Sequence, residues 1–103
     1  MSQIEEVAGR FPQVAGIGYT VDRAAEIGAR VTTLQIAGQS LELDRTYRAV
    51  SNNYVRNGGD GYKMFRGAQN AYDFGPDLAD VLAAFMAAAP DYRSRIEGRI
   101  TFK

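Results

Sequence analysis

The stretch GIGYTVDRAAEIGARVTTLQIAGQ, residues 16–39, contains the two clearest strand signals in this chain. In its first part, Ile17, Tyr19 and Val21 alternate with small or polar residues. An alternation with a period of two is typical of a half-buried strand. We therefore expect a strand over residues 14–22, with these three side chains on its buried face.

Three further segments complete the expected sheet. Residues 30–36 are rich in β-branched side chains, which favours a second strand. Ala37-Gly38-Gln39 is then expected to be a tight turn. An extended pattern predicts a third strand over residues 46–52, which would place the glycine-rich loop that follows it at a sheet edge. The alternation of residues 98–102 predicts a closing strand.

One main helix is predicted over residues 76–89. Pro76 suits the first helical position, and Pro90 ends the helix. Apolar side chains recur at the spacing of one helical face, and we expect this face to pack on the sheet. They are Leu78, Val81, Leu82, Phe85 and Ala88. A short helix is also expected over residues 2–8. The fold class is therefore α+β, with a mixed sheet of about four strands in one domain of 103 residues.

Composition excludes several classes of function. With 12 basic and 12 acidic residues the formal net charge is zero, which argues against nucleic-acid binding through a basic surface. No apolar run reaches the roughly 20 residues that span a bilayer, and the N-terminal residues do not resemble a signal peptide. The chain has no His and no Cys, so imidazole catalysis, thiol nucleophiles and ordinary zinc sites are excluded.

The segment SNNYVRNGGDGYKMF, residues 51–65, carries the candidate site. Its spacing does not fit a phosphate-binding P-loop or an EF-hand calcium loop. One interpretation is a plain tight turn, because Gly and Asp tolerate positive φ. The other is a ligand loop, since glycines let a ligand approach the backbone, an aromatic face can stack on a base, and a carboxylate can accept hydrogen bonds from a diol. A nucleoside offers all three complementary features.

Four blocks in this chain resemble the C-terminal domain of the 5′-nucleotidase family. They are FPQVAGI from residue 11, YRAVSNNY from residue 47, NGGDGY with MF over residues 57–65, and EGRI from residue 97. The family includes UDP-sugar hydrolases and 2′,3′-cyclic phosphodiesterases, and a related sulfur-oxidation enzyme carries a similar domain. The resemblance implies that this chain is part of a nucleoside-recognition domain, whose partner is an N-terminal metallophosphatase domain that holds two divalent metal ions.

The resemblance also implies roles for single residues. Tyr54 would be one of two aromatic residues that sandwich the base, and Asp60 would bind the ribose hydroxyls. Gly58 and Gly59 would shape the loop. The neighbouring residues Asn53, Asn57 and Tyr62 complete the expected substrate-binding set. No catalytic residue and no metal ligand is expected in this chain.

In the family, the second stacking aromatic residue and the arginines that reach the phosphate lie upstream of the first block, and we expect them to be absent here. This chain is then a domain truncated on its N-terminal side, without the metallophosphatase domain. Alone it would be inactive and would bind a nucleoside or nucleotide weakly. The alternative is a self-associating structural module, a homodimer, that has lost ligand binding. For the parent, the resemblance implies a periplasmic, secreted or cell-surface location.

Overall fold

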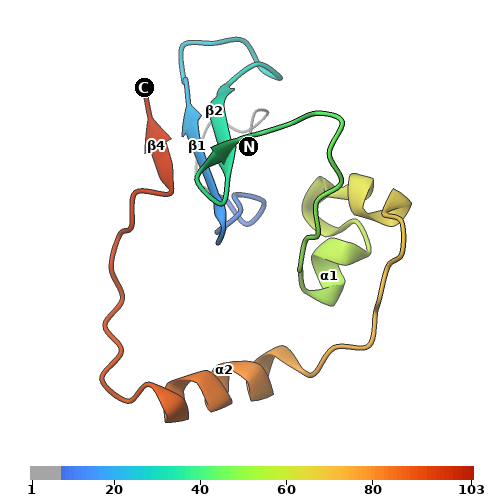
Figure 1. The fold of residues 1–103 in the computed structure, drawn as a ribbon, viewed down its shortest axis with the longest axis vertical. Helices are drawn as coiled ribbons and strands as arrows, with labels where there is room; N and C mark the ends of the chain where they lie inside the picture. The colour runs from blue at the N-terminus through green and yellow to red at the C-terminus, as the bar shows by residue number, and fades with distance from the viewer. Residues whose placement is uncertain (1–7) are drawn as a thin grey trace. The chain divides into compact units, whose positions relative to one another are not determined.

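The computed structural model describes residues 8–103, which form two compact units that are described separately (Figure 1). The first unit comprises residues 8–47 and 96–103, and the second comprises residues 48–95. The predicted N-terminal helix over residues 2–8 lies almost wholly outside the described residues. The sequence predicts one domain, and the described residues divide into these two units.

A mixed four-stranded sheet organises the first unit, which confirms the predicted fold class. Strand β1 (Ile17–Val21) pairs antiparallel with β2 (Val31–Ile36), and β2 pairs antiparallel with β3 (Gln39–Ser40). Strand β4 (Ile100–Phe102) runs parallel to β1, so the strand order is β3-β2-β1-β4 (Figure 1). The three predicted strands at 14–22, 30–36 and 98–102 are thus present, each shorter than predicted.

The core of this unit lies on the face of β1 that the sequence indicates. Tyr19 and Val21 are buried, with 7% and 4% of their surface exposed. At one end of the sheet the rings of Phe11 and Phe102 stack with their centroids 6.3 Å apart, and the guanidinium of Arg23 lies 4.4 Å from the centroid of Phe102. Two of the three side chains that the alternation places on the buried face of β1 are therefore buried, and the third, Ile17, is half-buried.

A two-residue turn joins β2 to β3, as predicted for residues 37–39. Ala37 and Gly38 have φ angles of 50° and 78°, and Ile36 pairs with Gln39 across the turn. Positive φ at both central positions is the geometry that matches the twist of a hairpin. Strand β2 also contains a bulge, where Thr33 has a φ of 45° and the register with β1 shifts.

The predicted third strand over residues 46–52 is wrong. This segment has neither helix nor strand, and the third strand of the sheet is the short β3 instead. A strand needs a hydrogen-bonded neighbour and a covered face, whereas Val50 is fully exposed here. The side chain of Asn52 is used to cap a helix. The glycine-rich loop consequently follows a helix and does not end a strand at the sheet edge.

The main helix, α2 (Leu78–Ala88), is present within the predicted range of 76–89. Asp77 is its N-cap residue, with an extended backbone of φ −59° and ψ 138°, so Pro76 precedes the cap and is not the first helical residue. Asp is a preferred residue at this position, although its side chain makes no capping hydrogen bond here.

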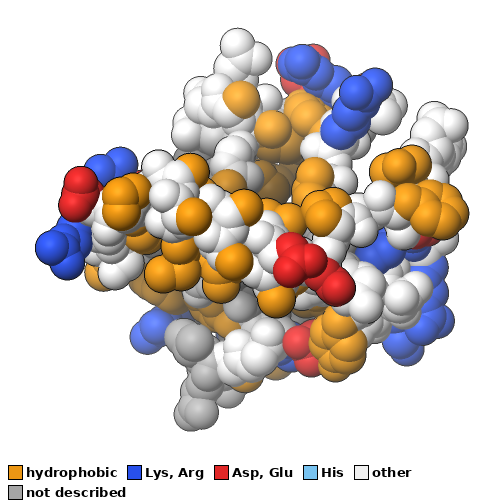
Figure 2. All heavy atoms as spheres, turned by 90° about the horizontal axis from the view of Figure 1, so that it is seen from below, with side chains coloured by type: hydrophobic (Ala, Val, Ile, Leu, Met, Phe, Trp, Pro, Cys, Tyr) orange, Lys and Arg blue, Asp and Glu red, His pale blue; other side chains and the backbone are white. Residues whose placement is uncertain are grey.

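The expected burial of the apolar face of α2 is not observed. None of the residues of α2 is buried, and the large side chains of its stripe are between 47% and 66% exposed. Figure 2 shows hydrophobic side chains at the surface in the view from below. A helix stripe is buried only where a second apolar layer covers it, and the described residues do not cover this one. No helix among residues 8–103 is long and apolar enough to span a membrane.

Candidate nucleoside site

A single-turn helix, α1 (Asn53–Arg56), positions the first residues of the candidate site. It begins where Oδ1 of Asn52 accepts a hydrogen bond of 2.8 Å from the backbone N–H of Val55. It ends at Arg56, and Asn57 is its C-cap residue. The next residue, Gly58, has a φ of 88° and donates its N–H to the carbonyl of Val55 at 2.9 Å. A left-handed glycine after the last turn is a common helix stop. These two signals place Tyr54 directly beside the loop.

The loop after α1 reverses the chain within a few residues. Gly58, Asp60 and Gly61 have φ angles of 88°, 51° and 84°, and residues Gly59–Gly61 form the short 3₁₀ helix η1. Asp is one of the few residues with a side chain that tolerates this region of backbone space. A second 3₁₀ helix, η2 (Lys63–Gly67), follows, and both contact α1. Gly and Asp residues therefore take the positive φ angles that the sequence predicts for a tight turn.

The aromatic ring of Tyr54 lies over the backbone of Gly59. A Cβ atom placed on Gly59 would stand 2.5 to 2.6 Å from three consecutive ring atoms of Tyr54. Distances this similar place the position above the face of the ring, so only glycine leaves room for the tyrosine. The Tyr54 hydroxyl donates a hydrogen bond of 3.3 Å to Oδ1 of Asp60. The two residues with the most definite expected roles thus touch each other.

Arg66 was missed by the reasoning from sequence. Its Nε donates a hydrogen bond of 2.8 Å to the backbone carbonyl of Asn57, and its guanidinium lies against Gly58. Arg56 connects α1 to later parts of the same unit, since it donates to the carbonyl of Phe65 at 2.7 Å and pairs with Asp73 at 3.0 Å. The sequence shows only that a basic residue follows the glycine loop. This alone does not tell whether its side chain contacts the loop or points into solvent.

An open hollow of about 420 Å³ lies between α1 and the loop. Its lining contains Asn53, Tyr54, Asn57, Gly58 and Gly59, which are five of the seven residues predicted to bind substrate, together with Arg66. The volume falls in the range of about 300–1,000 Å³ that is usual for small-molecule sites. The sequence therefore grouped together residues that do surround one concave surface.

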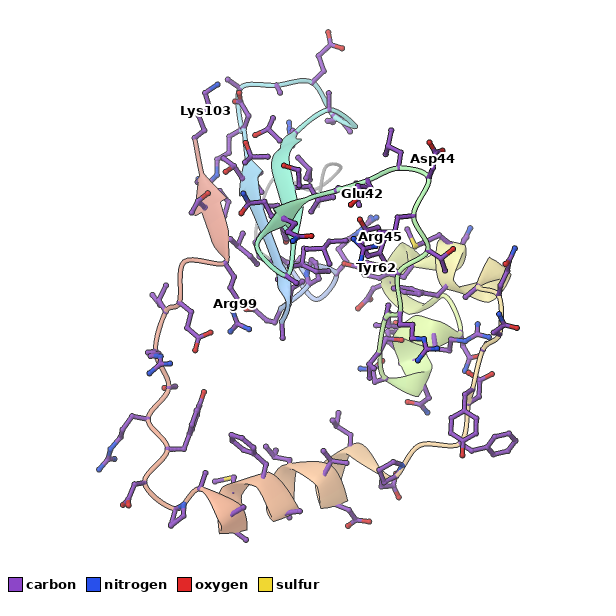
Figure 3. All side chains as sticks on the ribbon, viewed as in Figure 1. Glu42, Asp44, Arg45, Tyr62, Arg99 and Lys103 are labelled. Atoms are coloured by element: carbon purple, nitrogen blue, oxygen red, sulfur yellow. The ribbon has the colours of Figure 1, made fainter. Side chains whose placement is uncertain are left out.

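The two other predicted residues stand beside the hollow. Asp60 is exposed and connects to it through the hydrogen bond to Tyr54. Tyr62 is half-buried between η1 and η2, and its ring centroid lies 6.1 Å from that of Phe65 (Figure 3). Tyr62 therefore packs against the second 3₁₀ helix. No group of three His, Cys, Asp or Glu side chains that could hold a metal ion occurs among residues 8–103.

The sequence of this chain matches a known family over most of its length. Residues 2–67 match the model of the 5′-nucleotidase C-terminal domain. The chain belongs to this family. The matched range contains α1, the glycine loop and Arg66, so all residues of the hollow lie within it.

Relatives with the same domain are found in bacteria and animals. The trifunctional nucleotide phosphoesterase protein YfkN of Bacillus subtilis is 40% identical over 80 residues, which cover 73% of this chain and 6% of that protein. The 5′-nucleotidase of Homo sapiens is 28% identical over 102 residues, covering 91% of this chain and 18% of that protein. This 5′-nucleotidase C-terminal domain therefore spans less than a fifth of the length of these curated relatives.

Solved structures share its fold. A 5′-nucleotidase precursor from Thermus thermophilus superposes with a TM-score of 0.85 at 34% identity, over 92% of this chain and 20% of that one. The sulfate thiohydrolase SoxB of Thermus thermophilus superposes with a TM-score of 0.60 at 25% identity, over 84% of this chain and 15% of that one. The family resemblance carried by the four sequence blocks is confirmed.

Proposed function

We propose that this chain is the nucleoside-recognition part of a 5′-nucleotidase-like phosphohydrolase and is non-catalytic by itself. The observation that carries the proposal is the hollow beside the glycine loop, which the Tyr54 ring lines, with the carboxylate of Asp60 hydrogen-bonded to the Tyr54 hydroxyl beside it. The lining amides of Asn53 and Asn57 add polar atoms that can meet the edge of a base. The names of the relatives, which are nucleotidases and a nucleotide phosphoesterase, support the same ligand class.

Each group of the site has a separate task in this proposal. The base stacks on the ring of Tyr54, which is 57% exposed. The carboxylate of Asp60 accepts hydrogen bonds from the two ribose hydroxyls, and the Tyr54 hydroxyl holds that carboxylate in place. Because Gly59 has no Cβ atom, the ring of Tyr54 can lie directly over its backbone. Recognition thus needs no acid or base chemistry from this chain.

In the parent enzyme, we propose that this domain holds the nucleoside while the phosphate is hydrolysed elsewhere. Two divalent metal ions in an N-terminal metallophosphatase domain would supply a metal-activated water. The contribution of this chain is position, because a nucleoside held at Tyr54 and Asp60 fixes where its phosphate can lie. A secreted or surface location of the parent is part of the proposal, and one relative is named a snake venom 5′-nucleotidase.

The test is a titration of the ¹⁵N-labelled chain with adenosine, followed by ¹⁵N–¹H correlation spectra. One stacked base contributes about 1–3 kcal/mol, so we expect a dissociation constant of about millimolar or weaker. The peaks of residues 53–62 should shift. Tyr54→Ala should abolish these shifts, and Asp60→Ala should weaken binding of adenosine to the level shown by 2′,3′-dideoxyadenosine, which lacks the diol.

Two exposed residues outside the hollow provide matched controls. Tyr72 is 80% exposed and its ring lies against that of Phe74. Asp44 is exposed in a loop of the first unit (Figure 3). Tyr72→Ala and Asp44→Ala should leave adenosine binding unchanged. A folded wild-type chain whose peaks do not move with adenosine at saturating concentration would contradict the proposed function.

The exposed stripe of α2 favours a second candidate, a chain that associates with a second copy. Leu78, Val81, Leu82, Phe85 and Met86 are all between 47% and 66% exposed, and an exposed apolar stripe of this kind favours association in water. In this case the chain would sediment as a defined dimer and ignore nucleosides. Analytical ultracentrifugation with and without adenosine separates the two candidates.

A further inference from the structure

Two flat side chains lie on consecutive glycines in the wall of the hollow. The ring of Tyr54 covers Gly59, and the guanidinium of Arg66 covers Gly58. A Cβ atom on Gly58 would stand 2.8 Å from Nε, 3.2 Å from Cζ and 3.2 Å from Nη2 of Arg66. Three such similar distances place that position above the plane of the guanidinium. Each flat group therefore rests on the loop by one face.

The guanidinium of Arg66 is held by a single hydrogen bond. Its Nε donates to the carbonyl of Asn57 at 2.8 Å, and its terminal nitrogens make no hydrogen bond or ion pair with any of residues 8–103. Among the described residues, the side chain is therefore oriented by a backbone carbonyl and not by an acidic side chain. A guanidinium is planar and weakly hydrated, and it stacks readily on other flat groups, unlike a lysine ammonium.

We propose that Arg66 and Tyr54 together form a two-part stacking platform that makes this site select purine over pyrimidine nucleosides. The inference rests on the proposed function and adds to it a residue and a ligand class. Both side chains line the same hollow, and the glycines beneath them are neighbours in the chain. In this proposal a bicyclic base lies over both flat groups, whereas a single-ring base stacked on Tyr54 leaves the guanidinium uncovered.

The physical basis of the selection is the attraction between a cation and an aromatic face. At an exposed site, this attraction changes a binding constant by about two- to fivefold. Bases are known to stack on guanidinium planes as well as on aromatic rings. Because Arg66 is already fixed by its bond to Asn57, little side-chain freedom is lost when a base covers it. The contact therefore adds to the affinity of purines alone.

An arginine beside a nucleoside site could instead bind a phosphate group. Variants that change the charge and the planar shape of the Arg66 side chain independently distinguish the two roles. Arg66→Lys keeps the positive charge and removes the plane, and Arg66→Met keeps the unbranched stem and removes both. If Arg66 reads a phosphate, the variants change the ratio of affinities for adenosine monophosphate and adenosine but leave the ratio for adenosine and cytidine intact.

The experiment measures dissociation constants of adenosine and cytidine by titrating the ¹⁵N-labelled 103-residue chain. In Arg66→Lys we expect the ratio of adenosine to cytidine affinity to fall about two- to fivefold, with cytidine binding nearly unchanged. Unchanged cytidine binding also shows that the loop is intact. Arg66→Met should give the same fall. Arg45→Lys, which alters an exposed arginine paired with Glu42 at 3.2 Å in the first unit, is the matched control (Figure 3).

The outcomes separate this inference from the proposed function. If the wild type binds neither nucleoside, the proposed function and this inference both fail. If the wild type binds and both Arg66 variants keep its purine-to-pyrimidine ratio, the platform is refuted while the proposed function stands. A ratio that falls in the Arg66 variants but not in Arg45→Lys supports the platform.

Discussion

At the scale of single residues, the candidate site depends on which positions lack a side chain. Gly58 and Gly59 each carry a flat group directly above the backbone, so their missing Cβ atoms determine where Arg66 and Tyr54 lie. Gly58 also needs its left-handed φ of 88° to end helix α1. The same residue thus serves the local fold and the site. A substitution at Gly58 should therefore change both the stability of α1 and the position of Arg66.

Gly58→Ala should destabilise the second unit by about 1–2 kcal/mol, because an alanine there is forced into the left-handed region. Its Cβ would also push against Nε of Arg66, 2.8 Å away. Urea unfolding followed through the NMR peak intensities of residues 48–95 measures this loss. Gly67→Ala is the control, since nothing lies within 4 Å of its added Cβ, and it should change stability little. Equal stability of the two variants would contradict this account of Gly58.

At the scale of elements, α1 is too short to be stable through its own backbone bonds. A four-residue helix depends on the residues at its ends, here the N-cap Asn52 before it and the C-cap Asn57 with the left-handed Gly58 after it. Arg56 then ties it to the carbonyl of Phe65 and to Asp73. These contacts explain why a segment that looks extended in sequence becomes helical at residue 53.

Asn52→Ala should destabilise the second unit by about 1 kcal/mol, because the N–H of Val55 loses its acceptor. Amide hydrogen exchange at residues 54–58 should accelerate accordingly. Asn52→Asp retains an oxygen at the same place and should restore most of the protection. If the alanine and aspartate variants exchange alike, the cap does not stabilise α1.

Leu82→Gln should change the free energy of unfolding by less than about 0.5 kcal/mol, as expected for surface substitutions. Leu82 is 55% exposed on α2 and has little buried surface to lose. Val21→Ala is the contrasting variant, because Val21 is 4% exposed and should lose about 1.5 kcal/mol or more. A loss for Leu82→Gln as large as that for Val21→Ala, growing with protein concentration, would show that the stripe is covered by a second copy.

At the scale of the whole molecule, burial is concentrated in the sheet of the first unit. Among residues 8–103, the buried residues are Tyr19 and Val21 in β1 and Arg30 just before β2, whereas α2 has none. Helices of about 11 residues without a packed face are marginal in water. The chain is therefore expected to be unequally stable along its length.

Amide hydrogen exchange over the whole chain measures how local stability differs between the sheet and α2. Amides of β1 and β2 that pair across the sheet should exchange much more slowly than the amides of α2. The α2 amides should exchange at rates close to those of an isolated peptide of the same sequence. Slow exchange in α2 at low protein concentration would mean that its stripe is buried after all.

The sequence predicted much of this protein because several signals are local. Alternation at Ile17, Tyr19 and Val21 identified β1 and its buried face, and the spacing from Leu78 to Ala88 identified α2. The strand predicted over residues 46–52 is wrong because a locally extended pattern does not provide a neighbouring strand, and Val50 is fully exposed and lies in no strand of the described structure. Arg66 was not predicted because its place at the hollow depends on a bond to the carbonyl of Asn57, nine residues away.

By itself, the sequence determined the family, the order of the main elements and five of the six residues that line the hollow, because these depend on blocks of neighbouring residues. Tertiary structure alone decided that Tyr54 touches Asp60, that Arg66 rests on Gly58, and that the stripe of α2 is exposed. Such contacts depend on how the backbone turns between the residues, and on which surfaces another layer covers.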